Sequence, residues 1–186
     1  MATDRRFCRF VPPRPEFESN PVYMTRVPEG GMCLSCFLVI TEGDTERVLM
    51  GHLDPRAPWD HIGALDAERA EVHSRGWMLP SSHLVLHESP KEAARRILEE
   101  QLGLGGLELS EPTVLAESGT PKRFPDLPKH WDFEFVVRGK MGVGRAPKHD
   151  AWKELRFLDL ATTDRQEIAR SHDEVLENVG FRFRRP

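Results

Sequence analysis

Glu100 carries a carboxylate, a side chain with the oxygen ligands that hard cations such as Mg2+ prefer. It lies in a segment with helical spacing, where positions 97, 100 and 101 share one helix face at about 100° per residue. Carboxylates at all three positions would converge on a cation, but this face reads Ile97, Glu100 and Gln101. Isoleucine offers no oxygen ligand, and a glutamine carbonyl binds without neutralising charge. A single carboxylate with ligand phosphates can hold one ion such as Mg2+ or Mn2+, which is the most that Glu100 could do alone on this face.

Arg96 lies one helical turn before Glu100 and one turn after Glu92. An arginine four residues from a glutamate can pair with it, so we expect Arg96 to orient Glu100 rather than to contact a ligand. The alternative is an ordinary salt bridge on an exposed helix surface, worth less than about 1 kcal/mol. Both interpretations predict the same contact and differ only in the burial of the side chains.

A polar face alternates with an apolar one in the segment 131–138, which is typical of a strand. Asp132 and Glu134 share the polar face with His130 and alternate with Trp131 and two phenylalanines. This face, with Glu134 on it, can look into a ligand cleft. The alternative is that Asp132 and Glu134 simply face solvent on one side of a sheet.

The strongest single element that must position these residues is a helix over 90–102. Ser89, Pro90 and Glu92 form an N-cap, a proline at the first helical position and a capping box, and Gly103 supplies the stop. The helix therefore carries Arg96 and Glu100 on successive turns.

The remaining elements predict an α+β fold, a sandwich with the sheet between helices. Two strands at 32–41 and 47–53 are joined by turn chemistry and form an expected hairpin. We interpret 1–30 as an N-terminal arm, 31–180 as the domain with an insertion at about 54–75, and 181–186 as a basic C-terminal tail. Further expected elements are strands at 113–117, 131–138 and 154–158, a short helix at 65–73 and a terminal helix over 164–179.

Residues 76–104 resemble the Nudix box, the strand–loop–helix signature of the Nudix hydrolases, written G-x5-E-x7-R-E-U-x-E-E-x-G-U with U an apolar residue. The residues in register are Trp77-Met-Leu-Pro80, Glu88, Ala93-Ala94, Arg96, Leu98, Glu100, Gly103 and Leu104. The flanking strands extend the resemblance over about 32–180. It implies a Nudix-like α/β/α sandwich with a mixed sheet between helices, and a pyrophosphohydrolase of a nucleoside diphosphate-linked substrate.

Three positions depart from the box, and two of them concern metal. Ser82, Ile97 and Gln101 stand where the box has a glycine and two glutamates. The resemblance leaves Glu100 and Glu88 as metal ligands and assigns Glu134 the place of a general base outside the box. It also implies a depleted metal site with weak activity, or an inactive relative that binds a nucleotide, RNA or a protein. If Ile97 and Gln101 limit metal binding, changing both to glutamate should raise metal affinity.

A basic stretch follows the box helix and favours an anionic ligand. Residues 119–149 contain seven Lys and Arg residues and only three acidic residues, although the whole chain has a net charge of -4. Lys122, Arg123 and Lys129 are the candidate phosphate contacts; the alternative is a solvated loop. Trp59, Trp131 or Trp152 could stack on a base, although tryptophans are more often core residues.

Composition bears on the kind of partner and on the cellular compartment that we expect for this chain. The arginines of the arm and the Phe-Arg tail resemble single-strand binders, but the net charge is acidic, so nucleic acid is not the favoured partner. Cys8, Cys33 and Cys36 do not form a disulfide framework, and no apolar run is long enough for a membrane span. Cys33 and Cys36 point to opposite faces of their strand. A cytoplasmic protein is expected, and the resemblance implies a possible homodimer.

Overall fold

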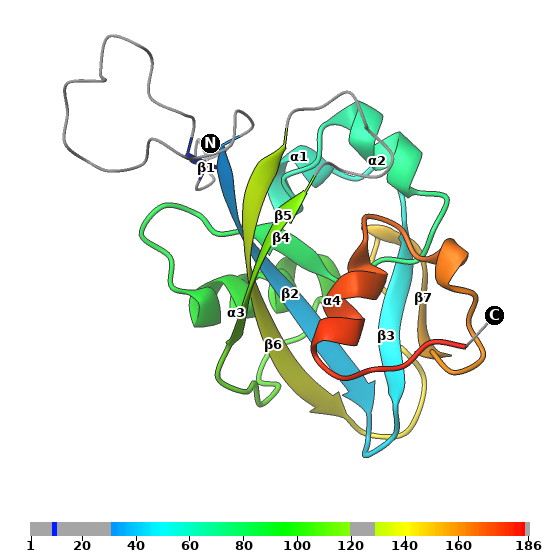
Figure 1. The fold of residues 1–186 in the computed structure, drawn as a ribbon. Helices are drawn as coiled ribbons and strands as arrows, with labels where there is room; N and C mark the ends of the chain where they lie inside the picture. The colour runs from blue at the N-terminus through cyan, green and yellow to red at the C-terminus, as the bar shows by residue number, and fades with distance from the viewer. Residues whose placement is uncertain (1–8, 11–30, 120–128, 185–186) are drawn as a thin grey trace, which may run out of the picture.

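The fold is an α/β/α sandwich built on one seven-stranded mixed sheet. Our computed structural model describes residues 9–10, 31–119 and 129–184 (Figure 1). The elements in chain order are β1 (Arg9–Phe10), β2 (Met32–Glu42), β3 (Arg47–Leu53), α1 (Trp59–Ile62), α2 (Ala67–His73), β4 (Ser81–His83), α3 (Pro90–Leu102), β5 (Thr113–Gly119), β6 (His130–Met141), β7 (Trp152–Asp159), the 3-10 helix η2 (Arg165–Glu167) and α4 (His172–Asn178).

β2 is the central strand and fixes the register of the sheet. The main order is β5-β6-β2-β3-β7, and β1 and β4 also pair with β2. β6 runs parallel to β2 over its whole length, with Ser35 opposite Glu134, whereas the other pairings are antiparallel. The expected β2–β3 hairpin and the mixed character of the sheet are therefore confirmed.

The two faces of the sheet bury separate hydrophobic clusters because side chains alternate along each strand. Leu38 of β2 and Val137 of β6 pack with α3 on one face. Val39 and Val136 pack with α4 on the other face. Figure 1 shows α4 in front of the sheet and α3 behind it. Each polar residue of β2 or β6 can thus be assigned to one face.

α3 begins and ends where its sequence predicts. The Ser89 hydroxyl accepts a hydrogen bond from the Glu92 amide, and the Glu92 carboxylate accepts one from the Ser89 amide, which completes the capping box. Gly103 closes the helix in the left-handed conformation, with a φ of 64°. These local interactions fix the rotational setting of positions 97, 100 and 101.

Replacing Ser89 with alanine should lower the free energy of unfolding by about 1 kcal/mol, because the N-cap hydrogen bond is lost. Urea denaturation followed by circular dichroism would measure the change. Lys91→Ala, two residues further along in the same first turn, is the matched control and should stay within about 0.5 kcal/mol of the parent chain. An equal effect of both changes would contradict the capping role.

The predicted terminal helix over 164–179 is wrong in its first half. The chain forms η2 and then α4, separated by residues 168–171. The Trp77 amide donates to the Glu167 carbonyl, and the Ala169 amide donates to the Trp77 carbonyl. Because these backbone groups bond across to Trp77, they are not available for helical hydrogen bonds. Arg170 and Ser171 follow, each with a φ of 57°.

The insertion at 54–75 contains α1 and α2 and closes one end of the sandwich. Trp59 and Trp152 meet edge-to-face there, 5.0 Å apart, and both are buried. Cys36 lies in the core on the α3 side while Cys33 is half-buried one alternation away, so the predicted separation of these two thiols holds. Among the described residues no helix is long and apolar enough to cross a membrane.

Candidate functional site

The box helix turns two of its three expected ligand positions into the core. Ile97 is 0% exposed and packs in the cluster between α3 and the sheet. Gln101 is also 0% exposed. Only Glu100 keeps access to solvent, with 29% of its side chain exposed. The shared helix face therefore points largely into protein rather than into a cleft.

Gln101 acts as an amide clamp between three segments of the chain. Its side-chain amide donates to the carbonyls of Ile62 and Ser81, each at 2.8 Å, and its Oε1 accepts from the Ser81 amide at 3.1 Å. Its backbone carbonyl accepts from the Trp152 indole at 2.7 Å. This arrangement needs a donor and an acceptor on one side chain, which glutamine supplies and glutamate does not.

Glu88 and Arg96 are engaged with each other. Arg96 donates from Nε and Nη2 to the two Glu88 oxygens, at 2.7 and 2.9 Å, and Nη2 also donates to the His83 carbonyl. The Val85 amide donates to Glu88 as well. Both side chains are little exposed, 13% for Arg96 and 12% for Glu88. The pair therefore ties the loop before α3 to the helix.

Arg96 meets only one of its two expected helix partners. Its Nη1 lies 3.8 Å from a Glu100 oxygen, which agrees with an orienting role for Arg96. Glu92 instead accepts hydrogen bonds from Ser89 in the capping box, and this interaction lowers the pKa of the Glu92 carboxyl. The burial of Arg96 favours the orienting interpretation over an ordinary surface salt bridge.

A divalent cation does not fit the donor set at the box. Hard cations prefer several oxygen ligands, whereas position 97 offers a methyl-bearing side chain and position 101 an amide already bonded on both sides. The carboxylate of Glu88 already accepts three hydrogen bonds. No group of three or more His, Cys, Asp or Glu side chains within the described residues is placed to hold a metal ion. Glu100 alone is left as a donor.

Glu134 lies on the other face of the sheet from α3. Val136 belongs to the α4-side cluster, so Asp132 and Glu134 also project toward α4 by alternation. Glu134 is 6% exposed, which excludes the alternative of a solvent-facing strand residue. The structure thus separates Glu134 from Glu88, Arg96 and Glu100 instead of bringing the four together.

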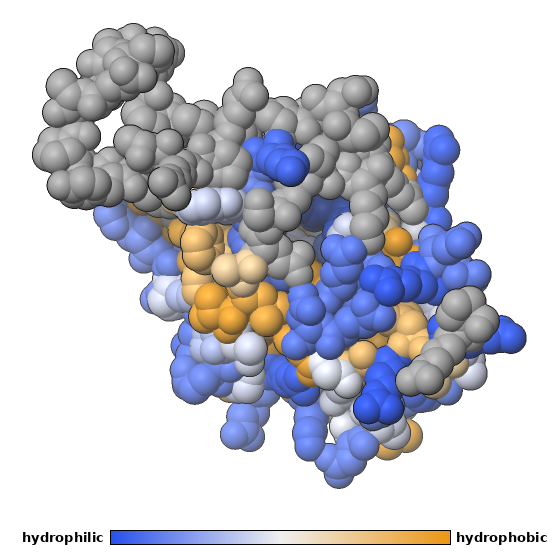
Figure 2. Space-filling model, in the orientation of Figure 1, coloured by the Kyte–Doolittle hydropathy of each residue, from blue (hydrophilic) through white to orange (hydrophobic). Residues whose placement is uncertain are grey.

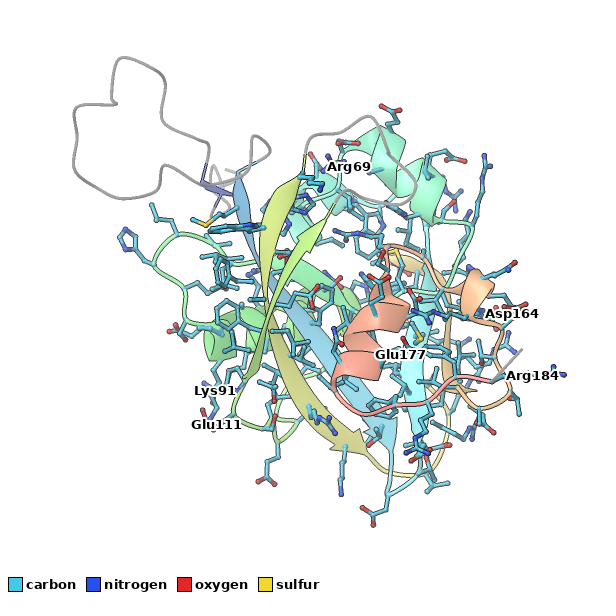
Figure 3. The ribbon with its side chains drawn as sticks, in the orientation of Figure 1. Arg69, Lys91, Glu111, Asp164, Glu177 and Arg184 are labelled. Carbon is cyan, nitrogen blue, oxygen red and sulfur yellow. The ribbon has the colours of Figure 1, made fainter. Side chains whose placement is uncertain are left out.

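A second group of ionisable side chains surrounds Asp132 on this face. The Ser35 hydroxyl donates to Asp132 Oδ1 at 2.7 Å, and burial raises the pKa of the Asp132 carboxyl despite that hydrogen bond. The charge of Arg170 acts on Asp132, and the charges of Asp132, Arg69 and Cys33 act on Arg170. Figure 3 shows Arg69 beside the ends of β5 and β6. We call Asp132, Glu134, Arg170 and His172 the polar cluster.

His172 is buried at the start of α4 and belongs to the polar cluster. Its Nδ1 accepts a hydrogen bond from the Leu79 amide at 2.9 Å, so Nε2 carries the ring proton. Burial lowers the pKa of His172 well below its usual value, and the Arg170 charge lowers it further. The imidazole is therefore neutral at neutral pH. Neither Arg170 nor His172 was a candidate site residue from the sequence, because the apolar spacing over 164–179 predicted one continuous helix.

Among the described residues of the basic stretch, Lys129 lies far from Arg138 and Lys140, so these three side chains do not form one surface. Lys122 and Arg123 lie outside the described residues. Lys129 precedes β6, while Arg138 and Lys140 lie near its far end, about 30 Å away at the rise of a strand. These two line a separate surface cavity of about 640 Å³. Lys140 pairs there with Asp44 at 2.6 Å.

The aromatic candidates for ligand stacking are largely used in packing. Trp59 and Trp152 are buried against each other, and Trp131 is half-buried on β6. In the tail, Phe181 and Phe183 pack against the α4-side cluster. Figure 2 shows hydrophilic residues over much of this face with apolar residues between them. The tail aromatics are therefore not free platforms for single-stranded nucleic acid.

Comparison with known proteins identifies the architecture. No family model matches the chain, and no curated protein matches it. The NUDIX domain of Shewanella oneidensis NrtR, crystallised with ADP ribose, aligns with a TM-score of 0.52 at 16% identity, over 80% of this chain and 86% of that one.

Two further solved structures give the same result. A mutT/nudix family protein from Listeria innocua aligns with a TM-score of 0.52 at 18% identity, over 79% of this chain and 90% of that chain. A MutT NUDIX hydrolase from Burkholderia pseudomallei aligns with a TM-score of 0.51 at 20% identity, over 80% and 98%. Together with the sheet order and the helix on each face, these likenesses show that the chain has the Nudix fold.

Proposed function

We propose that the chain is a Nudix-fold protein that binds a nucleoside diphosphate-linked ligand and does not use the box as a metal-dependent catalytic centre. The observation that carries this proposal is the burial of positions 97 and 101, with the Gln101 amide bonded to Ser81 and Ile62. A glutamate at either position would place an uncompensated charge in the core. The box helix thus supports the structure of the domain.

The ligand class is supported by the likeness to the Shewanella domain, which was crystallised with ADP ribose. Lys129 is exposed just before β6, and with Lys122 and Arg123 it remains a proposed phosphate contact. The buried polar side chains between β6 and α4 supply further hydrogen-bonding groups. A partly buried ligand in this region would meet both charged and polar groups.

A calorimetric titration of the whole chain with ADP-ribose tests this function. We expect the same affinity, within about threefold, in EDTA and in Mg2+, and no release of AMP or ribose 5-phosphate above a protein-free blank. Retention of binding in EDTA follows from the missing cation ligands at the box. Absence of ADP-ribose binding under both conditions would overturn the proposal.

One observation favours a second candidate, a pyrophosphohydrolase with a depleted site: Glu100 stays 29% exposed beside Arg96. In that case hydrolysis would depend on Mg2+ or Mn2+, and Glu100→Gln would abolish it. Glu99→Gln, the exposed neighbour on the same helix, is the matched control. Metal-dependent release that survives in Glu99→Gln and disappears in Glu100→Gln would establish this second function instead of the first.

A further inference from the structure

The backbone at the start of α4 is held in an unfavourable conformation. Arg170 and Ser171 are consecutive, and each has a φ of 57°. The left-handed region costs a residue with a Cβ about 1–2 kcal/mol, and such residues persist where the surroundings over-determine them. Here the Ala169 amide is bonded to Trp77 and His172 to the Leu79 amide. The segment is thus pinned on both sides of the strained pair.

The strained turn brings the Arg170 guanidinium near the half-buried Asp132 carboxyl, with no hydrogen bond or ion pair between them. Arg170 is half-buried, and its charge interacts with Asp132. The guanidinium has no hydrogen bond or ion pair to any residue in the described part of the chain. Burial lowers the pKa of Arg170 to about 10, so it remains charged at neutral pH.

His172 adds a second unused donor close to Arg170. Its side chain is 1% exposed, and Nε2 has no hydrogen-bond partner among the residues that the structure describes. A buried N–H without a partner costs about 1–3 kcal/mol. Two donors beside a strained turn that have no acceptor within the described part of the chain are suited to a bound molecule that supplies acceptors.

The acceptors beside these donors restrict what that molecule can be. Asp132 and Glu134 lie on the same face of β6, and their carboxylates can accept hydrogen bonds from hydroxyl groups. A neutral sugar offers such hydroxyl groups but brings no anionic group to the Arg170 guanidinium. A phosphorylated sugar meets both needs, because its phosphate oxygens accept hydrogen bonds and its hydroxyl groups donate them.

We propose that Arg170 and His172 bind the phosphate of a phosphorylated sugar and that Asp132 and Glu134 accept hydrogen bonds from its hydroxyl groups. The inference rests on the proposed function only for the class of ligand, and it locates the contacts on the α4 face rather than at the box helix. Asp132, Arg170, Cys33 and Arg69 are half-buried, so solvent reaches the edge of this cluster.

The test is calorimetry on the whole chain in EDTA with ribose 5-phosphate and, separately, ADP-ribose. Arg170→Gly should weaken ribose 5-phosphate binding at least tenfold while leaving the melting temperature equal or higher, because glycine accepts the left-handed conformation. Ser171→Gly is the matched control, since it relieves the same backbone strain without removing the guanidinium. It should raise the melting temperature and leave the affinity within twofold.

Failure of the site and failure of the proposed function give different results. Unchanged affinity in Arg170→Gly, or no ribose 5-phosphate binding by the parent chain, would overturn the site. ADP-ribose binding that is insensitive to Arg170→Gly would leave the proposed function in place with its contacts elsewhere. Ribose 5-phosphate binding without ADP-ribose binding would support the site and overturn the proposed function. A lower melting temperature in Arg170→Gly would show a structural role for Arg170 and count against the site.

Discussion

Replacing Gln101 with glutamate should destabilise the protein by about 3–5 kcal/mol at neutral pH, the cost of an uncompensated charge in a buried site. The carboxylate would still accept from the Ser81 amide, but it cannot donate to the carbonyls of Ser81 and Ile62. Its oxygens would instead face two carbonyl oxygens at hydrogen-bond distance. Urea denaturation at several pH values would measure the loss.

The pH dependence of this variant identifies the cause. Burial next to two acceptors must raise the pKa of the new carboxyl above its unfolded value of about 4.3. Because the folded state then binds the proton more tightly, the variant is least impaired below that value and loses stability as pH rises through the folded pKa. A destabilisation that does not change with pH would point to altered packing alone.

Glu99→Gln is the matched control for the same helix. It exchanges the same two side-chain types in the opposite direction at an exposed position, and we expect a change within about 0.5 kcal/mol. A Gln101→Glu protein with an unchanged urea midpoint and new Mg2+ affinity would contradict the clamp and restore the ligand interpretation of this position.

The same geometry reverses the expectation for the double change of Ile97 and Gln101 to glutamate. Residue types alone suggest that the double change would give positions 97, 100 and 101 three carboxylates that could bind a metal ion. In the structure the side chains of Ile97 and Gln101 are 0% exposed, so two carboxylates would enter the core before any cation could reach them. The double variant should fail to fold at neutral pH rather than gain metal affinity.

Local chemistry made parts of the fold predictable. α3 was predicted over 90–102 and observed from Pro90 to Leu102, because its cap, first-turn proline and terminal glycine act within a few residues of one another. The prediction of one helix over 164–179 was wrong because contacts distant in the sequence decide the backbone there. The apolar spacing of this segment is helical, but the backbone of Glu167 and Ala169 bonds to Trp77, about ninety residues earlier in the chain.

The site was predictable in its residue types but not in its partners. A helical wheel is enough to show that positions 97, 100 and 101 share a face that lacks two carboxylates. It cannot show that Gln101 is bonded to Ile62 of the insertion, 39 residues away. Nor can it place Arg170 beside Asp132, since that contact depends on the strained turn before α4. Long-range contacts decide which box residues remain available for chemistry.

Breaking the Glu88–Arg96 pair should be the second large effect, at about 3–5 kcal/mol for Arg96→Leu, because it leaves a buried carboxylate with one backbone donor. Glu88→Leu should lower the free energy of unfolding by a similar amount, because it leaves the buried Arg96 guanidinium without its carboxylate partner. The double change should cost less than the sum, since neither charge is then left uncompensated. We expect a coupling energy of about 2 kcal/mol from the urea-denaturation cycle.

Lys91 and Glu111 provide the matched control cycle. Their ion pair also involves a residue of α3 and is shorter, at 2.5 Å against 2.7 Å, but its side chains are 38% and 82% exposed (Figure 3). Solvent screening should hold its coupling below about 1 kcal/mol. Equal coupling in both cycles would show that Glu88 and Arg96 behave as a surface pair in solution. A larger coupling for Glu88 and Arg96 would mean that these two box residues stabilise the loop–helix junction through their own contact, without any bound cation.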